Sequence, residues 1–125
     1  MKTIKAIIDY VDSVKPNQYT KEQKIEWLSE IDYQIFNEII LTHAHEEGAS
    51  FDGYKTGDEN KELLAPEPYA NLIYTSYLEA KIDYNNAEYS KFNNSMVLFN
   101  NAYETFHNFY KRNHRPYPEK LKVKF

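Results

Sequence analysis

The chain has 125 residues, of which 42% are hydrophobic and 16% aromatic, and it carries 15 basic and 19 acidic side chains for a net charge of −4. This length supports one hydrophobic core, and the absence of cysteine excludes disulfides, thiolate metal sites and a cysteine nucleophile. Nowhere do about 18 apolar residues run together and no export signal is visible, so we expect a soluble protein.

Helices account for most of the predicted structure, because only three glycines and five prolines interrupt stretches rich in alanine, leucine, isoleucine, glutamate and lysine. We therefore expect an all-α protein, a small bundle of about four helices. The first helix is predicted over residues 3–14, where isoleucine and valine recur on one face. Pro16 ends it, because the residue before a proline avoids helical geometry.

The second predicted helix begins with a capping box, in which the side chains of Thr20 and Gln23 satisfy free backbone N–H groups. Its apolar face continues to about His45. The core residues expected on this helix are Trp27, Leu28 and Ile35.

A long loop is predicted next, since periodicity disappears between residues 46 and 66 and all three glycines of the chain lie there. Residues 46–62 contain six acidic side chains and two lysines, so the loop between the second and third helices is acidic. Connections of this length are uncommon in compact domains and are either contact loops or disordered. The candidate contact residues are Phe51, Tyr54, Asp58 and Glu59.

A third helix is predicted to begin at Pro68, whose missing N–H costs nothing in a first turn, with Tyr77 on its core face. Large apolar residues then recur with alternating steps of three and four: Tyr89, Phe92, Met96, Phe99, Tyr103, Phe106 and Tyr110. This heptad seam forms one stripe on a helix, which lies in the chain's own core or partly faces another subunit. We predict that Phe99, Tyr103 and Phe106 are buried.

The boundary between the third and fourth helices is ambiguous in the sequence. The heptad phase runs unbroken through residues 93–95, yet Asn-Asn-Ser is also typical of a turn followed by a helix N-cap. We predict a break near Asn93 and Asn94, with the fourth helix continuing to residue 112.

The end of the chain is basic. Residues 111–125 hold six basic residues and one acid, net +5, so the other 110 residues carry −9. We divide the chain into a helical domain over residues 1–112 and a basic tail over residues 113–125. The tail is either a solvated terminus or an arm that docks on an acidic or phosphate surface, and its alternating apolar and lysine residues suit a strand added to a neighbour's edge. The candidate interaction residues are Arg112, Arg115, Lys120, Lys122, Lys124 and Phe125.

One cluster has ligand chemistry, His43 and His45 followed by Glu46 and Glu47. Histidines two residues apart on a helix point in different directions and the His-Glu-x-x-His zinc spacing is missing, so a solvated helix end is the favoured interpretation. The sequence contains no glycine-rich phosphate loop and no nucleophile elbow. We predict no catalytic, cofactor-binding or metal-binding residue; a small metal-dependent accessory enzyme is the alternative.

Several segments carry a resemblance to a known family: WLSEID (27–32), LLAPEPY (63–69), YLEAKID (77–83), EYSKFNNS (88–95) and FNNAY (99–103). They look like small proteins from the head-morphogenesis regions of phages and prophages of Firmicutes, which are similar to the head–tail connector, or adaptor, family. The match covers roughly residues 20 to 112, its motifs are packing motifs, and the tail lies outside it.

The resemblance implies a structural protein of virion assembly that forms a ring beneath the portal. The implied partners are the portal protein, tail-completion proteins and further copies of the chain, from a protomer that stays monomeric until a portal templates the ring. It also implies that DNA passes without specific binding, and it places the protein in the host cytoplasm and then at the head–tail junction, away from membranes. A prophage DNA-binding regulator that uses the basic tail is the remaining alternative.

Overall fold

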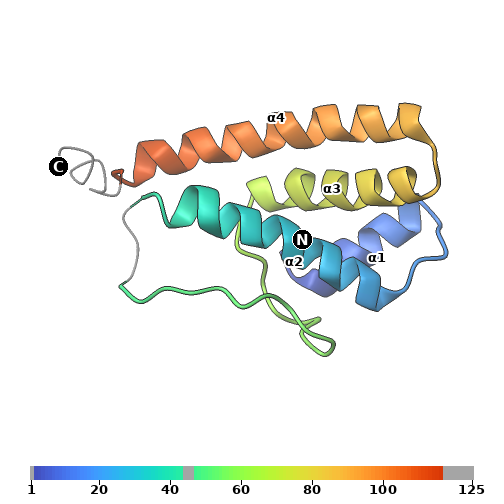
Figure 1. The fold of residues 1–125 in the computed structure, drawn as a ribbon, viewed down its shortest axis with the longest axis horizontal. Helices are drawn as coiled ribbons and strands as arrows, with labels where there is room; N and C mark the ends of the chain where they lie inside the picture. The colour runs from blue at the N-terminus through green and yellow to red at the C-terminus, as the bar shows by residue number, and fades with distance from the viewer. Residues whose placement is uncertain (1, 44–46, 117–125) are drawn as a thin grey trace.

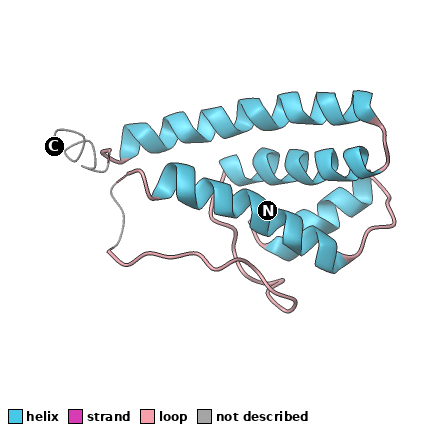
Figure 2. Ribbon diagram, viewed as in Figure 1, coloured by secondary structure: helices cyan, strands magenta, loops and turns pink. Residues whose placement is uncertain are grey.

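The computed structural model describes residues 2–43 and 47–116 of the chain. In chain order, the elements are α1 (Ile4–Val14), α2 (Lys21–Ile35), the π-helical segment η1 (Phe36–Ile40), α3 (Tyr69–Asn85) and α4 (Tyr89–Asn113). The described residues form no strand, only isolated bridges between Thr3 and Glu62 and between His43 and Pro116 (Figure 2). The prediction of a small all-α bundle is therefore confirmed.

Helix α3 is the centre of the bundle. It packs against α1, α2 and α4, whereas α4 packs almost entirely on α3. Figure 1 shows α4 as an outer layer above α3, with α1 and α2 on the opposite side and the long connection passing below α2. The loop and α4 thus lie on opposite sides of the molecule.

The first two helices begin as their sequences predict. Thr3 caps α1 by accepting the amide of Ala6 at 3.2 Å, and the capping box of Thr20 and Gln23 is present at the start of α2. The face of α1 that enters the core consists of Ile4, Ile7, Ile8 and Val11.

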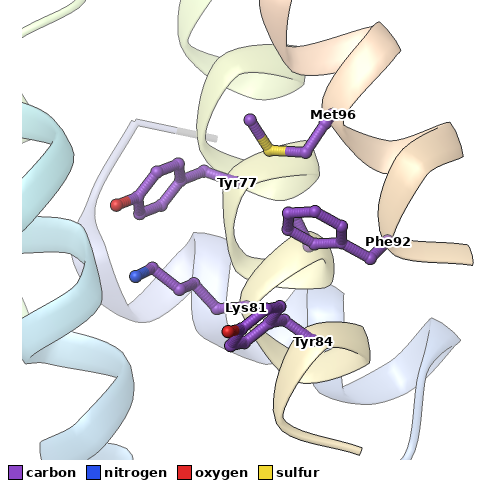
Figure 3. A pocket seen from close by; sticks show the side chains of 6 residues that line it. Tyr77, Lys81, Tyr84, Phe92 and Met96 are labelled. Atoms are coloured by element: carbon purple, nitrogen blue, oxygen red, sulfur yellow. The ribbon is translucent and has the colours of Figure 1, made fainter. Parts of the chain in front are cut away.

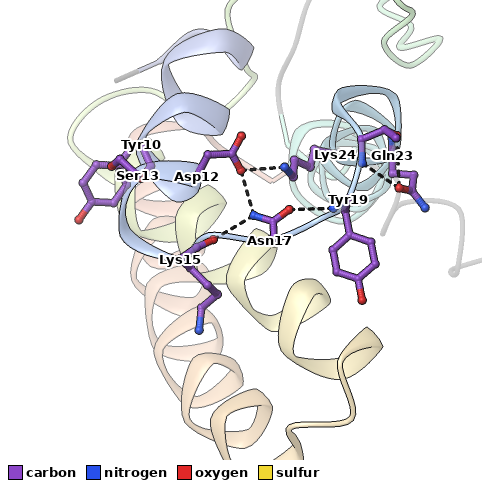
Figure 4. A network of polar contacts seen from close by, with 9 residues as sticks. Tyr10, Asp12, Ser13, Lys15, Asn17, Tyr19, Gln23 and Lys24 are labelled. Atoms are coloured by element: carbon purple, nitrogen blue, oxygen red, sulfur yellow. Dashed lines mark hydrogen bonds and ion pairs between the residues drawn. The ribbon is translucent and has the colours of Figure 1, made fainter.

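A polar network fixes the turn between α1 and α2 (Figure 4). The Asp12 carboxylate accepts the Lys24 ammonium at 2.7 Å and the Asn17 amide at 3.0 Å. The Asn17 side chain also donates to the Lys15 carbonyl and accepts the Tyr19 amide. Lys24 is buried on α2, so pairing with Asp12 is what makes its burial tolerable.

Helix α2 does not continue to His45 as predicted. It passes into η1, which closes with a bond from the Leu41 amide to the Phe36 carbonyl, and it ends at Ile40. The Thr42 hydroxyl donates to the Glu38 carbonyl at 2.9 Å, which occupies a carbonyl left free at the helix end. His45 itself lies outside the described residues.

The predicted break at Asn93 and Asn94 is wrong, because both residues lie inside α4 and α3 ends at Asn85. The turn is a Schellman motif: the Glu88 amide donates to the Asp83 carbonyl and the Ala87 amide to the Tyr84 carbonyl. Ala87 has a φ of +59° at the position where glycine is usual. Because the sequence has no glycine here, its pattern does not mark the turn.

The aromatic seam is buried only in part. Phe99 and Phe106 are enclosed against α3, whereas Tyr103 is half-buried, so the prediction that Tyr103 is buried is wrong. Its hydroxyl instead reaches the Glu38 carboxylate at 2.6 Å at the surface. Of the other expected core residues, Tyr77 is also half-buried, and the following are buried: Trp27, Leu28 and Ile35.

Candidate interaction surface

The long connection is held to the helices by one buried carboxylate, Asp32 of α2. The Tyr74 hydroxyl donates to it at 2.5 Å, the Leu64 amide donates at 3.0 Å, and the Tyr54 hydroxyl also donates to it. The Tyr74 hydroxyl in turn accepts the Ala65 amide at 2.8 Å. Asp32 thereby joins α2, α3 and two points of the connection.

The buried environment of Asp32 raises the pKa of its carboxyl group. Burial raises the pKa of Asp32 to about 6, while the hydrogen bonds from Tyr54, Tyr74 and the Leu64 amide favour the charged form and limit the rise. Asp32 is not among the site residues predicted from the sequence. The available signal is its position, since Asp32 falls between Ile31 and Ile35 on the apolar face of α2.

The loop residues predicted to contact a partner are engaged with the chain's own fold. The Phe51 ring packs against the Tyr33 ring, with centroids 5.0 Å apart. The Tyr54 hydroxyl donates a hydrogen bond to the Asp32 carboxylate. The Asp58 carboxylate accepts the Lys55 amide within a turn. Glu59 pairs with Lys21 at 3.0 Å, and its carbonyl accepts the Lys5 amide. These contacts fix the loop, and its role toward a partner stays a prediction.

A groove of about 380 Å³ lies between α2 and this loop. We call it the acidic groove, and its charged lining residues are Glu22, Glu26, Asp52 and Lys55. Its walls come close together because position 53 is a glycine with a φ of +87°, where a Cβ would lie 2.9 Å from the Tyr33 hydroxyl. A side chain at position 53 would therefore displace the Tyr33 ring or the loop, and it would be strained at this φ.

A second groove, of about 280 Å³, separates α3 from the first half of α4 (Figure 3). Its lining is Tyr77, Ala80, Lys81, Tyr84, Phe92 and Met96. The Lys81 ammonium pairs with Glu30 at 3.0 Å and lies 5.5 Å from the centre of the Tyr77 ring. Phe92 and Met96 belong to the heptad seam, so the seam is open to solvent at this end and closed at Phe99.

The described histidines are packed among aromatic rings. His43 is buried, its Nδ1 lies 2.8 Å from the Ile39 carbonyl, and its ring meets the edge of Tyr110. Burial lowers the pKa of the neighbouring His107. Within residues 2–43 and 47–116 no three acidic or histidine side chains are arranged to hold a metal, and His45 and Glu46 lie outside these ranges.

The basic end of the chain begins beside η1, because Pro116 forms a bridge with His43. Arg112 and Arg115 are exposed. The remaining tail candidates lie outside the described residues: Lys120, Lys122, Lys124 and Phe125.

The described helices include none that is both long and apolar enough to span a bilayer. Comparison with models of protein families, with curated proteins and with solved structures finds no match to this chain.

Proposed function

We propose that this protein is a structural, non-catalytic subunit that assembles with copies of itself in the head–tail connector ring beneath the portal of a tailed phage or prophage. The family resemblance over residues 20–112 supports the connector assignment. One structural observation, the lack of charge on the exposed positions of α4 between residues 92 and 103, supports assembly independently of that resemblance.

The uncharged stretch of α4 runs over residues 92–103. In a chain with 27% charged residues, twelve positions would hold about three charges by composition alone. Half of the positions in the stretch are exposed: Asn93, Asn94, Val97, Leu98, Asn100 and Asn101. The exposed fractions of Val97 and Leu98 are 58% and 50%.

A solvated helix normally carries charged residues on the side opposite its packed face. Depletion of charge is instead characteristic of the central part of protein–protein interfaces, where desolvating a charge is costly. Asparagine and aliphatic side chains lose less hydration free energy than charged side chains when they are buried, and they can pair with side chains of a neighbouring subunit. We therefore assign this face of α4 to contact with the next subunit or with the portal.

The test is a lysine placed in the middle of this face, Leu98→Lys, with Asn108→Lys as the matched control. Asn108 is exposed on the same helix, outside the uncharged stretch. Self-association and binding to the portal protein of the same phage or prophage are measured by sedimentation velocity, and particles are viewed by electron microscopy.

We expect Leu98→Lys to abolish assembly and Asn108→Lys to retain it, with equal helical circular dichroism in both. Assembly by both variants equally would place the interface elsewhere. A wild-type chain that associates neither with itself nor with the portal would contradict the connector function. A portal or major capsid gene beside the gene for this chain would support it.

A further inference from the structure

The acidic groove holds carboxylates that the chain's own fold does not pair. Neighbouring loop acids are paired, Glu59 with Lys21 and Asp58 with Lys61. The groove acids Glu22, Glu26 and Asp52 form no ion pair with the described residues, and Lys55 is the one cation of the lining. The groove therefore offers a net negative, hollow surface.

The lining of the acidic groove is not uniformly polar. Tyr33 is 41% exposed, and the apolar part of the lining also includes Ile25 and Tyr54. Such a surface fits an extended segment in which cationic and apolar residues alternate. Apolar side chains on one side of the segment contact the rings, and ammonium groups on the other side meet the carboxylates.

We propose that the acidic groove binds the basic tail of a second copy of this chain, through residues 120–125. This segment alternates lysine with leucine, valine and phenylalanine, and it brings three ammonium groups to three carboxylates. The inference rests on the proposed function, because it names the contact between neighbouring subunits of the assembly. It adds a second face to the interface on α4.

Chain geometry favours a second copy over the chain's own tail. The tail leaves from Pro116, which is bridged to His43, and Lys120 follows four residues later, at most about 14 Å away. Glu26 precedes His43 by 17 residues, about 25 Å along a helix. To reach Glu22 and Glu26, the tail of the same molecule must run back along α2 in an extended conformation. The tail of a second copy does not share that constraint.

The test uses engineered thiols, since the chain has no cysteine of its own. Full-length Thr56→Cys, in the groove lining, is mixed with full-length Val123→Cys under mild oxidation, and disulfide-linked dimers are quantified on non-reducing gels. Both substitutions leave every charge in place. The matched control replaces Thr56→Cys with Ser13→Cys, which is exposed on α1.

We expect several-fold more linked dimer from the groove pair than from the control pair, and less at high salt. Adding Glu22→Lys and Glu26→Lys to the groove copy should lower the yield by about tenfold. Adding Lys122→Glu and Lys124→Glu to the tail copy should then restore it, because the charges are exchanged.

Two results would overturn the inference. If the chain assembles in the Leu98-dependent manner described above but the groove and control pairs link equally, the groove is not the tail site and the proposed function stands. If a chain carrying both thiols closes internally while the mixed copies do not link, the tail binds its own groove. A chain that associates neither with itself nor with the portal protein would, by contrast, contradict the proposed function itself.

Discussion

Replacing Tyr74 by phenylalanine removes one oxygen from the centre of the network that holds the long connection against α2 and α3. That oxygen donates to the buried Asp32 carboxylate and accepts the Ala65 amide. A hydrogen bond to a charged group contributes about 1.5–3 kcal/mol, and a buried amide left without an acceptor costs about 1–3 kcal/mol. The two losses share one atom and are not additive, so we expect a destabilisation of about 3 kcal/mol.

The measurement is urea denaturation followed by circular dichroism at pH 7, with Tyr77→Phe as the control. The Tyr77 hydroxyl donates to Glu30 at 3.1 Å near the surface, and its loss should cost less than about 1 kcal/mol. The ring and its packing remain in both variants. If the two variants differ by less than about 0.5 kcal/mol, the Asp32 network does not stabilise the fold as argued.

Three further perturbations test other parts of the structure. Phe106→Ala should lower the free energy of unfolding by about 3–5 kcal/mol, because the ring is 1% exposed; an unchanged melting temperature would contradict its placement in the core. Ala87→Gly should raise stability by about 0.5–1 kcal/mol in urea titrations, because Ala87 has a φ of +59°, and a loss would argue against the Schellman turn. Burial raises the pKa of Asp32 from 3.8 to about 6, so the folded state binds a proton more tightly than the unfolded state. The free energy of unfolding should therefore fall by about 2 kcal/mol as pH rises from 4 to 6, judged against Asp32→Asn.

Local signals predicted most of the helical structure. The capping box of Thr20 and Gln23 and the proline after α1 mark helix ends through groups only a few residues apart, and the structure confirms both. The turn between α3 and α4 escaped prediction because its left-handed position is filled by Ala87. Packing of α4 on α3 supplies the free energy that makes an alanine acceptable there, and a sequence pattern does not report that packing.

The aromatic seam shows a different limit of sequence reasoning. Periodicity identifies residues that share one stripe of a helix, but it does not say how far the neighbouring helix extends beneath them. Phe99 and Phe106 pack directly on α3. The ring centroids are 5.3 Å apart for Phe99 and Tyr77 and 5.7 Å apart for Phe106 and Tyr69. Tyr89, at the start of the same stripe, is 57% exposed.

The Asp32 network and the acidic groove have weaker sequence signatures still. Asp32 gains its partners from residues 22, 32 and 42 positions away in the chain. The groove depends on Gly53, whose missing side chain lets the loop approach Tyr33. Such long-range contacts follow from the assembled fold, so the sequence predicted an acidic loop without locating the surface it forms.

The uncharged run in α4, in contrast, is visible in the sequence, yet its meaning depends on the fold. In a central helix, residues 92–103 would be unremarkable core. In an outer helix that packs almost entirely on α3 (Figure 1), half of these positions are exposed and none is charged. The acidic groove lies on the opposite side of the bundle, beneath α2. In the proposed assembly the tail of one subunit enters the groove of the next, so the contact joins two different surfaces and is heterologous. Heterologous contacts close into a ring when the rotation between subunits allows it, whereas a twofold dimer joins the same surface of both copies.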